Sequence, residues 1–140
     1  RANTLQIELT TQAFRLTGDP SNLVERDAAI ADRETSLAQI GEFVRDHPQQ
    51  HDRWLALRDV IHERLAISRR VEELRKTEGE AAANAYVATA PLRSTRERVY
   101  QLLGDMVVTE RSRVTRQEAA HEQARQLLVT SGVLAALALT

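Results

Sequence analysis

The amino-acid sequence predicts an all-α protein: an antiparallel up-down-up-down four-helix bundle with a short extra helix before the last long helix. Its 140 residues are 42% hydrophobic but only 4% aromatic, and long stretches consist of good helix formers such as Ala, Leu, Arg and Glu. Apolar residues recur at helical spacing, and most of the few Gly and Pro residues fall between these stretches. Because short connections force neighbouring helices to pack side by side, these observations favour a bundle.

The first helix is expected over residues 1–17, with Leu5, Leu9 and Leu16 on its apolar side. The segment Thr17-Gly18-Asp19-Pro20 then predicts a left-handed glycine after the helix, a capping Asp and a proline in the first turn of the next helix. Since this helix is much shorter than the last one, we expect that a membrane-proximal stretch has been trimmed from its start.

The second helix is expected from Pro20 to about Asp46, because Leu23, Ile30, Leu37 and Val44 recur every seven residues. Proline disfavours helical geometry in the residue before it, so His47-Pro48 predicts a second reversal. The third helix is expected to end near Gly79 after about 45 Å. Its apolar positions have three- and four-residue spacing and are Trp54, Leu57, Val60, Ile61, Ile67, Val71 and Leu74.

A short alanine-rich helix is expected between Glu80 and Ala90, and Pro91 then begins the longest helix. Leu92, Val99, Met106 and Leu127 fall on one seven-residue grid, so this helix extends about 60 Å or more into the apolar end of the chain.

The segment from Gln126 to Thr140 contains no charged residue. Spanning a bilayer takes about 20 apolar residues, so we interpret residues 127–140 as the start of a transmembrane helix. A buried terminal helix is the alternative for so short a run. The apolar residues of this stub are Leu127, Leu128, Val129, Val133, Leu134, Leu137 and Leu139.

The charge pattern, the lack of cysteine and the lack of catalytic motifs argue against several classes of function. The formal net charge is −1 with interleaved signs, which gives no basic footprint for nucleic acid. The chain has no cysteine, and no nucleophile constellation or glycine-rich phosphate loop is recognisable. We therefore expect no catalytic residue, no metal and no cofactor.

Two carboxylate-x-x-His pairs, Asp59/His62 and Glu118/His121, imitate the ligands of di-metal helix bundles. Counting rise along the expected helices puts the pairs about 20 Å apart, too far for shared coordination. His47 and His51 flank a turn and are expected to be exposed.

Polar residues at or beside apolar grid positions are the candidates for ligand binding, and we single out Arg64, Arg69 and Arg113. Long arginines usually lay their stems along the core edge with the guanidinium in water, which is the simpler interpretation. For the pair Arg69-Arg70, nearby glutamates offer local partners.

Three motifs resemble the third class of CHASE extracytoplasmic sensor domains. The first helix ends in a match to E-S-G-Q-R-G-Y-L-L-T-G-D, although Gln12, Ala13 and Arg15 depart from it, so the family's Arg has no counterpart. The later matches follow the patterns D-N-P-x-Q-Q-x-R-L-x-x-L and L-R-x-x-G-x-x-A-x-x-x-V-x-T-G, with Ala90-Pro91 in place of Gly-Lys in the latter. The matching residues are Glu8, Phe14, Leu16, Thr17, Gly18 and Asp19, then Asp46, Pro48, Gln50, Arg53 and Leu57, then Leu74, Arg75, Gly79, Ala82, Val87 and Thr89, and also Glu110.

This resemblance implies a periplasmic sensor over residues 1–126 of a bacterial inner-membrane protein, followed by the membrane helix. It implies a two-component histidine kinase whose catalysis lies outside these residues, with the last helix carrying the stimulus to a cytoplasmic output module. The expected partners are a second copy through helix faces, the inner membrane through the flanking helices, and an unknown small molecule or periplasmic protein. A chemoreceptor or cyclase ligand domain, or a non-sensing dimerisation or partner-binding bundle, is the alternative.

Overall fold

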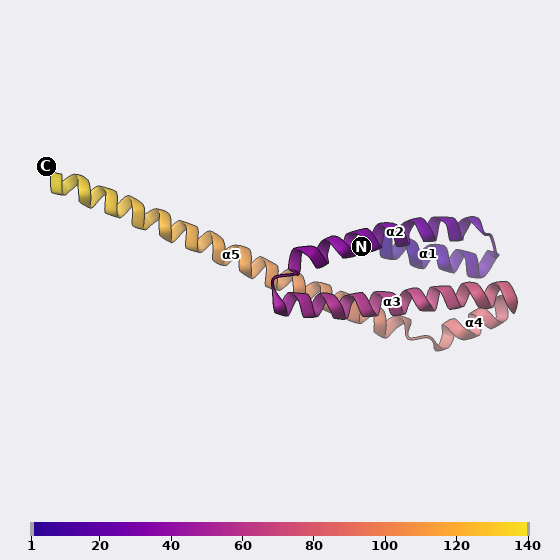
Figure 1. Cartoon of the computed structure of the whole chain (residues 1–140). Helices are drawn as coiled ribbons and strands as arrows, with labels where there is room; N and C mark the ends of the chain where they lie inside the picture. Colours follow the sequence, from indigo (N-terminus) through magenta and orange to yellow (C-terminus); the bar gives the residue numbers. More distant parts are fainter. Residues whose placement is uncertain (1, 140) are drawn as a thin grey trace. The chain divides into compact units, whose positions relative to one another are not determined.

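The computed structural model describes the backbone of residues 2–139 and the side chains of residues 5–130. This backbone forms α1 (Ala2–Thr17), α2 (Ser21–Val44), α3 (Pro48–Thr77), α4 (Glu80–Thr89) and α5 (Leu92–Leu139), which confirms the all-α prediction (Figure 1). The chain divides into two compact units, residues up to Leu103 and residues from Gly104 onward. The first unit therefore contains α1 to α4 and the first turns of α5.

The connection between α1 and α2 is built as its sequence predicts. Gly18 has a φ of 71°, a left-handed conformation that glycine adopts without steric cost, and its amide donates to the carbonyl of Phe14 at 2.7 Å. The Asp19 carboxylate then accepts a 3.0 Å hydrogen bond from the amide of Ser21. Pro20 lies just outside α2, so the observed helix begins one residue later than expected.

The second connection also follows its proline. His47 is extended, with φ −118° and ψ 94°, and Pro48 occupies the first turn of α3. The helix before it ends at Val44, slightly before the expected Asp46, and the amide of Arg45 bonds to the carbonyl of Glu42 in a tightened last turn. These reversals are short enough to bring α1, α2 and α3 into contact with one another.

The buried face of α1 differs from the predicted one. Leu5, Leu9 and Leu16, the apolar positions from which this helix was predicted, are 56%, 52% and 49% exposed and do not form its core stripe. Among the side chains of α1 that the structure describes, those of Ile7, Thr10 and Phe14 are buried. Burial of Thr10 is tolerated because its hydroxyl donates to the carbonyl of Gln6 at 2.7 Å.

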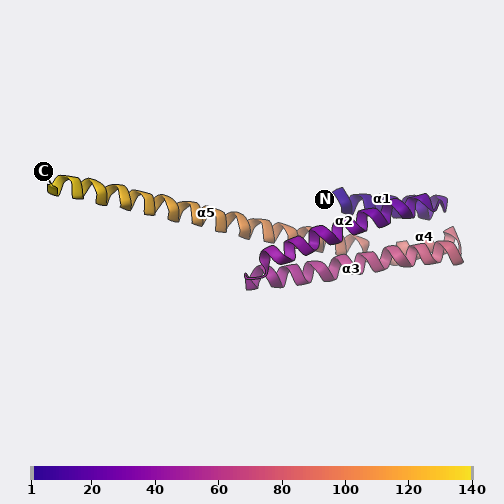
Figure 2. The ribbon, with the colours of Figure 1, turned by 45° about the horizontal axis from the view of Figure 1, so that its top comes forward.

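Ile7 of α1 packs with Ala29 and Ile30 of α2, and Leu65 of α3 packs against this group. Burial of each isoleucine side chain contributes roughly 1.5–3 kcal/mol, and the methyl group of Ala29 contributes less. The predicted heptad of α2 is confirmed, since Leu23, Ile30, Leu37 and Val44 are all buried. Figures 1 and 2 show α1 and α2 side by side along much of α1.

The contact between α2 and α3 is close at Gly41. A Cβ atom at this position would lie 2.5 Å from the Trp54 ring. The indole nitrogen of Trp54 donates a 2.8 Å hydrogen bond to the carbonyl of Leu37, so the ring is held against α2 both by packing and by this bond.

The short helix predicted after Gly79 is α4, and it packs against the end of α3. Val71 and Leu74 of α3 are buried with Ala83 of α4, and Tyr86 and Val87 cover them. The amide of Gly79 closes the turn by donating to the carbonyl of Leu74 at 3.0 Å.

The second unit consists of the remainder of α5, which is one uninterrupted helix from Leu92 to Leu139. Its described side chains from Val114 to Thr130 are exposed, and its ion pairs include Glu110–Arg113 and Glu122–Arg125, both at 2.8 Å. Leu127, Leu128 and Val129 of the predicted membrane stub are exposed on this helix. The other stub residues, Val133, Leu134, Leu137 and Leu139, lie outside the described side chains. Within the described part of the chain, no helix has an apolar stretch that would reach across a bilayer.

Candidate ligand site

A partly open cavity of about 280 Å³ lies in the first unit, lined by residues of α1, α2, α3, α4 and the first turns of α5. Every helix of the unit contributes to its wall, so its shape depends on how these helices pack. The wall combines aliphatic and polar side chains with four arginines. The lining residues are Ile7, Glu8, Thr11, Gln12, Arg15, Arg33, Arg64, Ile67, Ser68, Val71, Val87, Leu92 and Arg96.

Arg64, one of the three predicted candidates, lies in this wall. It is buried, and its Nη1 donates to the carbonyl of Leu92 and to the hydroxyl of Thr95, both at 2.7 Å. Its Nη2 forms an ion pair with Glu8 of α1. Arg64 therefore joins α1, α3 and the start of α5, and it is not an arginine whose guanidinium reaches into water.

Arg33 of α2 also lines the cavity and is 7% exposed. Among the described residues, its Nε and Nη2 atoms have no hydrogen-bond partner. Burial lowers the pKa of the Arg33 guanidinium from its usual value, Glu34 opposes this, and the positive charge of Arg64 lowers the pKa further. Arginine stays protonated in proteins, so a cation lies buried here beside another cation.

Arg15 and Arg96 add two further cations to the wall. The guanidinium of Arg15 donates to the side-chain carbonyl of Asn84 on α4, and Arg96 is exposed. Four guanidinium groups against the single carboxylate of Glu8 leave an excess of three positive charges among the lining residues. The lining residues therefore carry a net positive charge, which favours anions as ligands.

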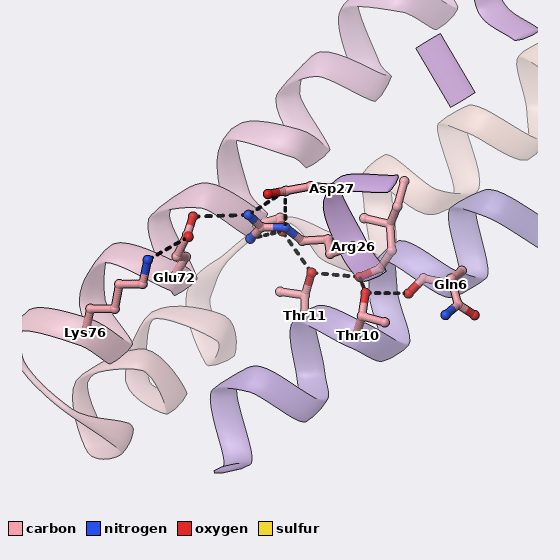
Figure 3. A network of polar contacts seen from close by, with 9 residues as sticks. Gln6, Thr10, Thr11, Arg26, Asp27, Glu72 and Lys76 are labelled. Carbon is pink, nitrogen blue, oxygen red and sulfur yellow. Dashed lines mark hydrogen bonds and ion pairs between the residues drawn. The ribbon is translucent and has the colours of Figure 1, made fainter. Parts of the chain in front are cut away.

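A polar network next to the cavity joins α1, α2 and α3 (Figure 3). The hydroxyl groups of Thr11 and Ser68 are 2.8 Å apart, and Nη1 of Arg26 donates to the Ser68 hydroxyl at 3.3 Å. Nη2 of Arg26 donates to Glu72 at 3.1 Å, and Lys76 donates to the other oxygen of Glu72 at 3.0 Å. Arg26 is only 1% exposed, so the network satisfies a fully buried cation.

Burial would raise the pKa of Glu72, but hydrogen bonds from Lys76 and Arg26 and their positive charges outweigh it. The net effect is a pKa below its ordinary value of 4.5. The carboxylate is therefore ionised at neutral pH and holds Arg26 in place.

The sequence interpretation missed Arg26 and Arg33, although a signal was present. Arg26 lies three residues after Leu23, and Arg33 lies three residues after Ile30. A heptad stripe has its second apolar residue at this spacing, and Ile40 occupies the same position after Leu37. A charged residue at such a position is buried whenever the stripe is fully covered. The heptad of α2 therefore pointed to both arginines.

The other two predicted candidates do not join the cavity. Arg69 is exposed on α3. Arg113 belongs to the second unit, where its Nη2 pairs with Glu110 at 2.8 Å.

The histidine pairs also lie outside the cavity. His62 approaches Glu34 at 3.4 Å, and Glu118 and His121 are exposed on α5. The described residues contain no group of three or more acidic, His or Cys side chains arranged to hold a metal ion.

The fold and the cavity define an all-helical module with a cation-lined cavity between its helices. A profile of the CHASE3 domain family matches residues 1–120, and the chain belongs to this family, as its motifs predicted. CHASE3 domains are extracellular sensor domains of signalling proteins and are not catalytic. Comparisons with curated proteins and with solved structures found no significant match.

Proposed function

We propose that this chain is the periplasmic input domain of a bacterial two-component sensor histidine kinase, and that α5 carries its state through the inner membrane to a cytoplasmic kinase. The membership in the CHASE3 family over residues 1–120 is the observation that carries this proposal. Catalysis by autophosphorylation and phosphorelay would lie outside these residues.

The continuity of α5 supports the route of the signal. The helix begins inside the first unit, where the carbonyl of Leu92 and the hydroxyl of Thr95 accept hydrogen bonds from buried Arg64, and it continues without interruption to Leu139. A continuous helix can convey a small slide, tilt or rotation, provided that the stimulus binds one arrangement better than the other.

The proposal includes the antiparallel four-helix bundle of α1, α2, α3 and α5, with α4 as the extra short helix. It also includes residues 1–126 as the sensor and residues 127–140 as the start of the membrane helix. The tight reversals around Gly18 and His47 and the contacts among α1, α2 and α3 support such a bundle.

A homodimer is part of the same proposal. Leu5, Leu9 and Leu16 are about half exposed and lie at four- and seven-residue spacing, so they form one apolar stripe on α1. The variant Leu9→Glu should shift the 140-residue chain towards the monomer in sedimentation velocity, whereas Val24→Glu, at an exposed position on α2, should not. An unchanged mass for Leu9→Glu contradicts this interface.

The location of the domain can be tested in intact cells, because the chain contains no cysteine. Ala88→Cys, on an exposed position of α4, should react with a membrane-impermeant maleimide before lysis, in a full-length protein that lacks other cysteines. Ala83→Cys, which is buried in the same helix, is the matched control and should stay unlabelled. Labelling of Ala88→Cys only after lysis contradicts a periplasmic domain.

The output distinguishes the kinase from the other members of its class. Incubation of membranes that contain the full-length protein with radiolabelled ATP should give an acid-labile, base-stable phosphohistidine. A chemoreceptor or cyclase would give no phosphohistidine, and neither would a dimerisation scaffold.

A further inference from the structure

The cavity contains a buried cation without a complete set of partners. Arg33 is only 7% exposed, so more than nine-tenths of it is buried. No described residue accepts a hydrogen bond from its Nε or Nη2. These two atoms form one edge of the guanidinium, the edge that binds two oxygens of a carboxylate or phosphate side by side. Leaving such a charge buried and unpaired is costly, and an anion that bound to it would offset the cost.

The neighbours of Arg33 increase this demand for an anion. Arg64 lies close enough to lower the pKa of Arg33, and its own carboxylate partner, Glu8, is already engaged in their ion pair. Glu34 approaches His62 at 3.4 Å and makes no hydrogen bond with Arg33 that satisfies its Nε or Nη2. The described residues that line this cavity therefore include more cations than carboxylates.

The remainder of the wall indicates what else the ligand carries. Ile7, Ile67, Val71, Val87 and Leu92 provide an aliphatic surface next to the arginines. At about 280 Å³, the cavity is slightly below the usual range of about 300–1,000 Å³ for small-molecule sites. The shape and chemistry suit a small molecule with one acidic group and a short aliphatic body.

We propose that this cavity binds a small aliphatic carboxylate, with its two oxygens on the Nε and Nη2 edge of Arg33 and its apolar body against Ile67, Val71 and Val87. The further statement that this ligand is the stimulus of the sensor rests on the proposed function. The bound ligand would contact α1, α2, α3, α4 and the first turns of α5 together, so it would favour one arrangement of these helices over others.

Isothermal titration calorimetry on the 140-residue chain tests this directly, with 4-methylpentanoate as the probe. Its uncharged analogue 4-methylpentanamide and inorganic phosphate are the comparison ligands. We expect the acid to bind at least tenfold more tightly than the amide, because only the acid neutralises Arg33, and tenfold more tightly than phosphate, which has no apolar body. Equal binding of the acid and either comparison ligand overturns the proposal.

Variants identify the site. Arg33→Met should weaken binding of the acid at least tenfold, whereas Arg69→Met, on an exposed position of α3, should leave it unchanged. If Arg33→Met does not fold, Val87→Phe tests the same cavity from its aliphatic side and should block the acid with all arginines in place. Unchanged binding in the folded Arg33 or Val87 variant overturns the proposal.

The calorimetry needs neither the membrane nor the kinase. If the acid did not bind, the ligand site would be overturned, but the cysteine-labelling and phosphohistidine results would still support the proposed function. If those two experiments failed, the measured binding constant would still support the ligand site.

Discussion

Nη2 of Arg26 on α2 donates a 3.1 Å hydrogen bond to Oε2 of Glu72 on α3, so a fully buried cation is paired with a partly buried carboxylate. The same guanidinium donates to Ser68, which in turn contacts Thr11 of α1. One side chain thereby fixes the relative positions of three helices, next to the cavity that we propose as the ligand site.

Arg26→Ala should lower the free energy of unfolding by about 2–4 kcal/mol, because it removes the cation from a buried pair and the packing of its aliphatic stem. Urea unfolding followed by circular dichroism measures this change. Arg69→Ala, at an exposed position, is the control and should change the free energy by less than about 0.5 kcal/mol. If Arg26→Ala and Arg69→Ala changed the free energy of unfolding equally, the polar network around Arg26 would contribute nothing to stability.

The depressed pKa of Glu72 gives stability a defined pH dependence. Since the pKa in the folded state lies below the ordinary 4.5, its stabilising contribution is complete above pH 4.5 and is lost as the pH falls through the folded value. Glu72→Gln should therefore destabilise the domain at pH 7 and have a much smaller effect near pH 2. Urea unfolding of the wild type and of Glu72→Gln at several pH values measures the difference in their free energies of unfolding. A difference that does not change with pH would contradict the role assigned to the Glu72 carboxylate.

Gly18 should not tolerate a side chain. At a φ of 71°, alanine is strained by about 1–2 kcal/mol, and its Cβ would also meet Nη2 of Arg75 at 2.9 Å. Arg75 cannot move freely, because its Nε donates to the carbonyl of Arg15 at 2.9 Å. We expect Gly18→Ala to lower the midpoint temperature of thermal unfolding.

Gly104→Ala is the matched control for Gly18→Ala, because Gly104 lies within α5 and no atom of the described residues lies within 4 Å of the position of a Cβ there. Replacing this helical glycine should raise stability by up to about 1 kcal/mol. Shifts of the same sign in both variants would contradict the account of the turn.

Gly41→Ala should displace Trp54, since the new Cβ would lie 2.5 Å from the ring. The displaced indole would lose its hydrogen bond to the carbonyl of Leu37 and become more exposed to water. Trp54 is the only tryptophan of the chain, so its fluorescence emission should shift to longer wavelength. Ala38→Ser, at an exposed position of the same helix, should leave the spectrum unchanged.

The sequence was sufficient to predict most of the helices because their signals were local. Gly18, His47-Pro48 and Pro91 mark turns through backbone geometry alone, and the heptad of α2 places Leu23 and Leu37 in the core. The face of α1 was not predictable in this way. It carries one stripe through Leu9 and another through Ile7 and Phe14, and the choice between them depends on the neighbouring helices.

The candidate site was only partly predictable for a related reason. Arg64 interrupts an apolar pattern and was recognised, but its partners Glu8 and Thr95 come from helices far apart in the sequence. The missing partner of Arg33 depends on the position of every neighbouring side chain. Such a property belongs to the tertiary structure and leaves no local pattern.

The most direct test of the central claim, that α5 carries the state of the sensor to a kinase, is the autophosphorylation rate of the full-length protein with α5 interrupted. Ala119→Pro, at an exposed position, removes a helical hydrogen bond and costs about 3 kcal/mol, whereas Ala119→Ser leaves the helix continuous. We predict that Ala119→Pro changes the rate at least threefold relative to wild type, while Ala119→Ser retains the wild-type rate. Equal rates in the two variants would contradict transmission through this helix.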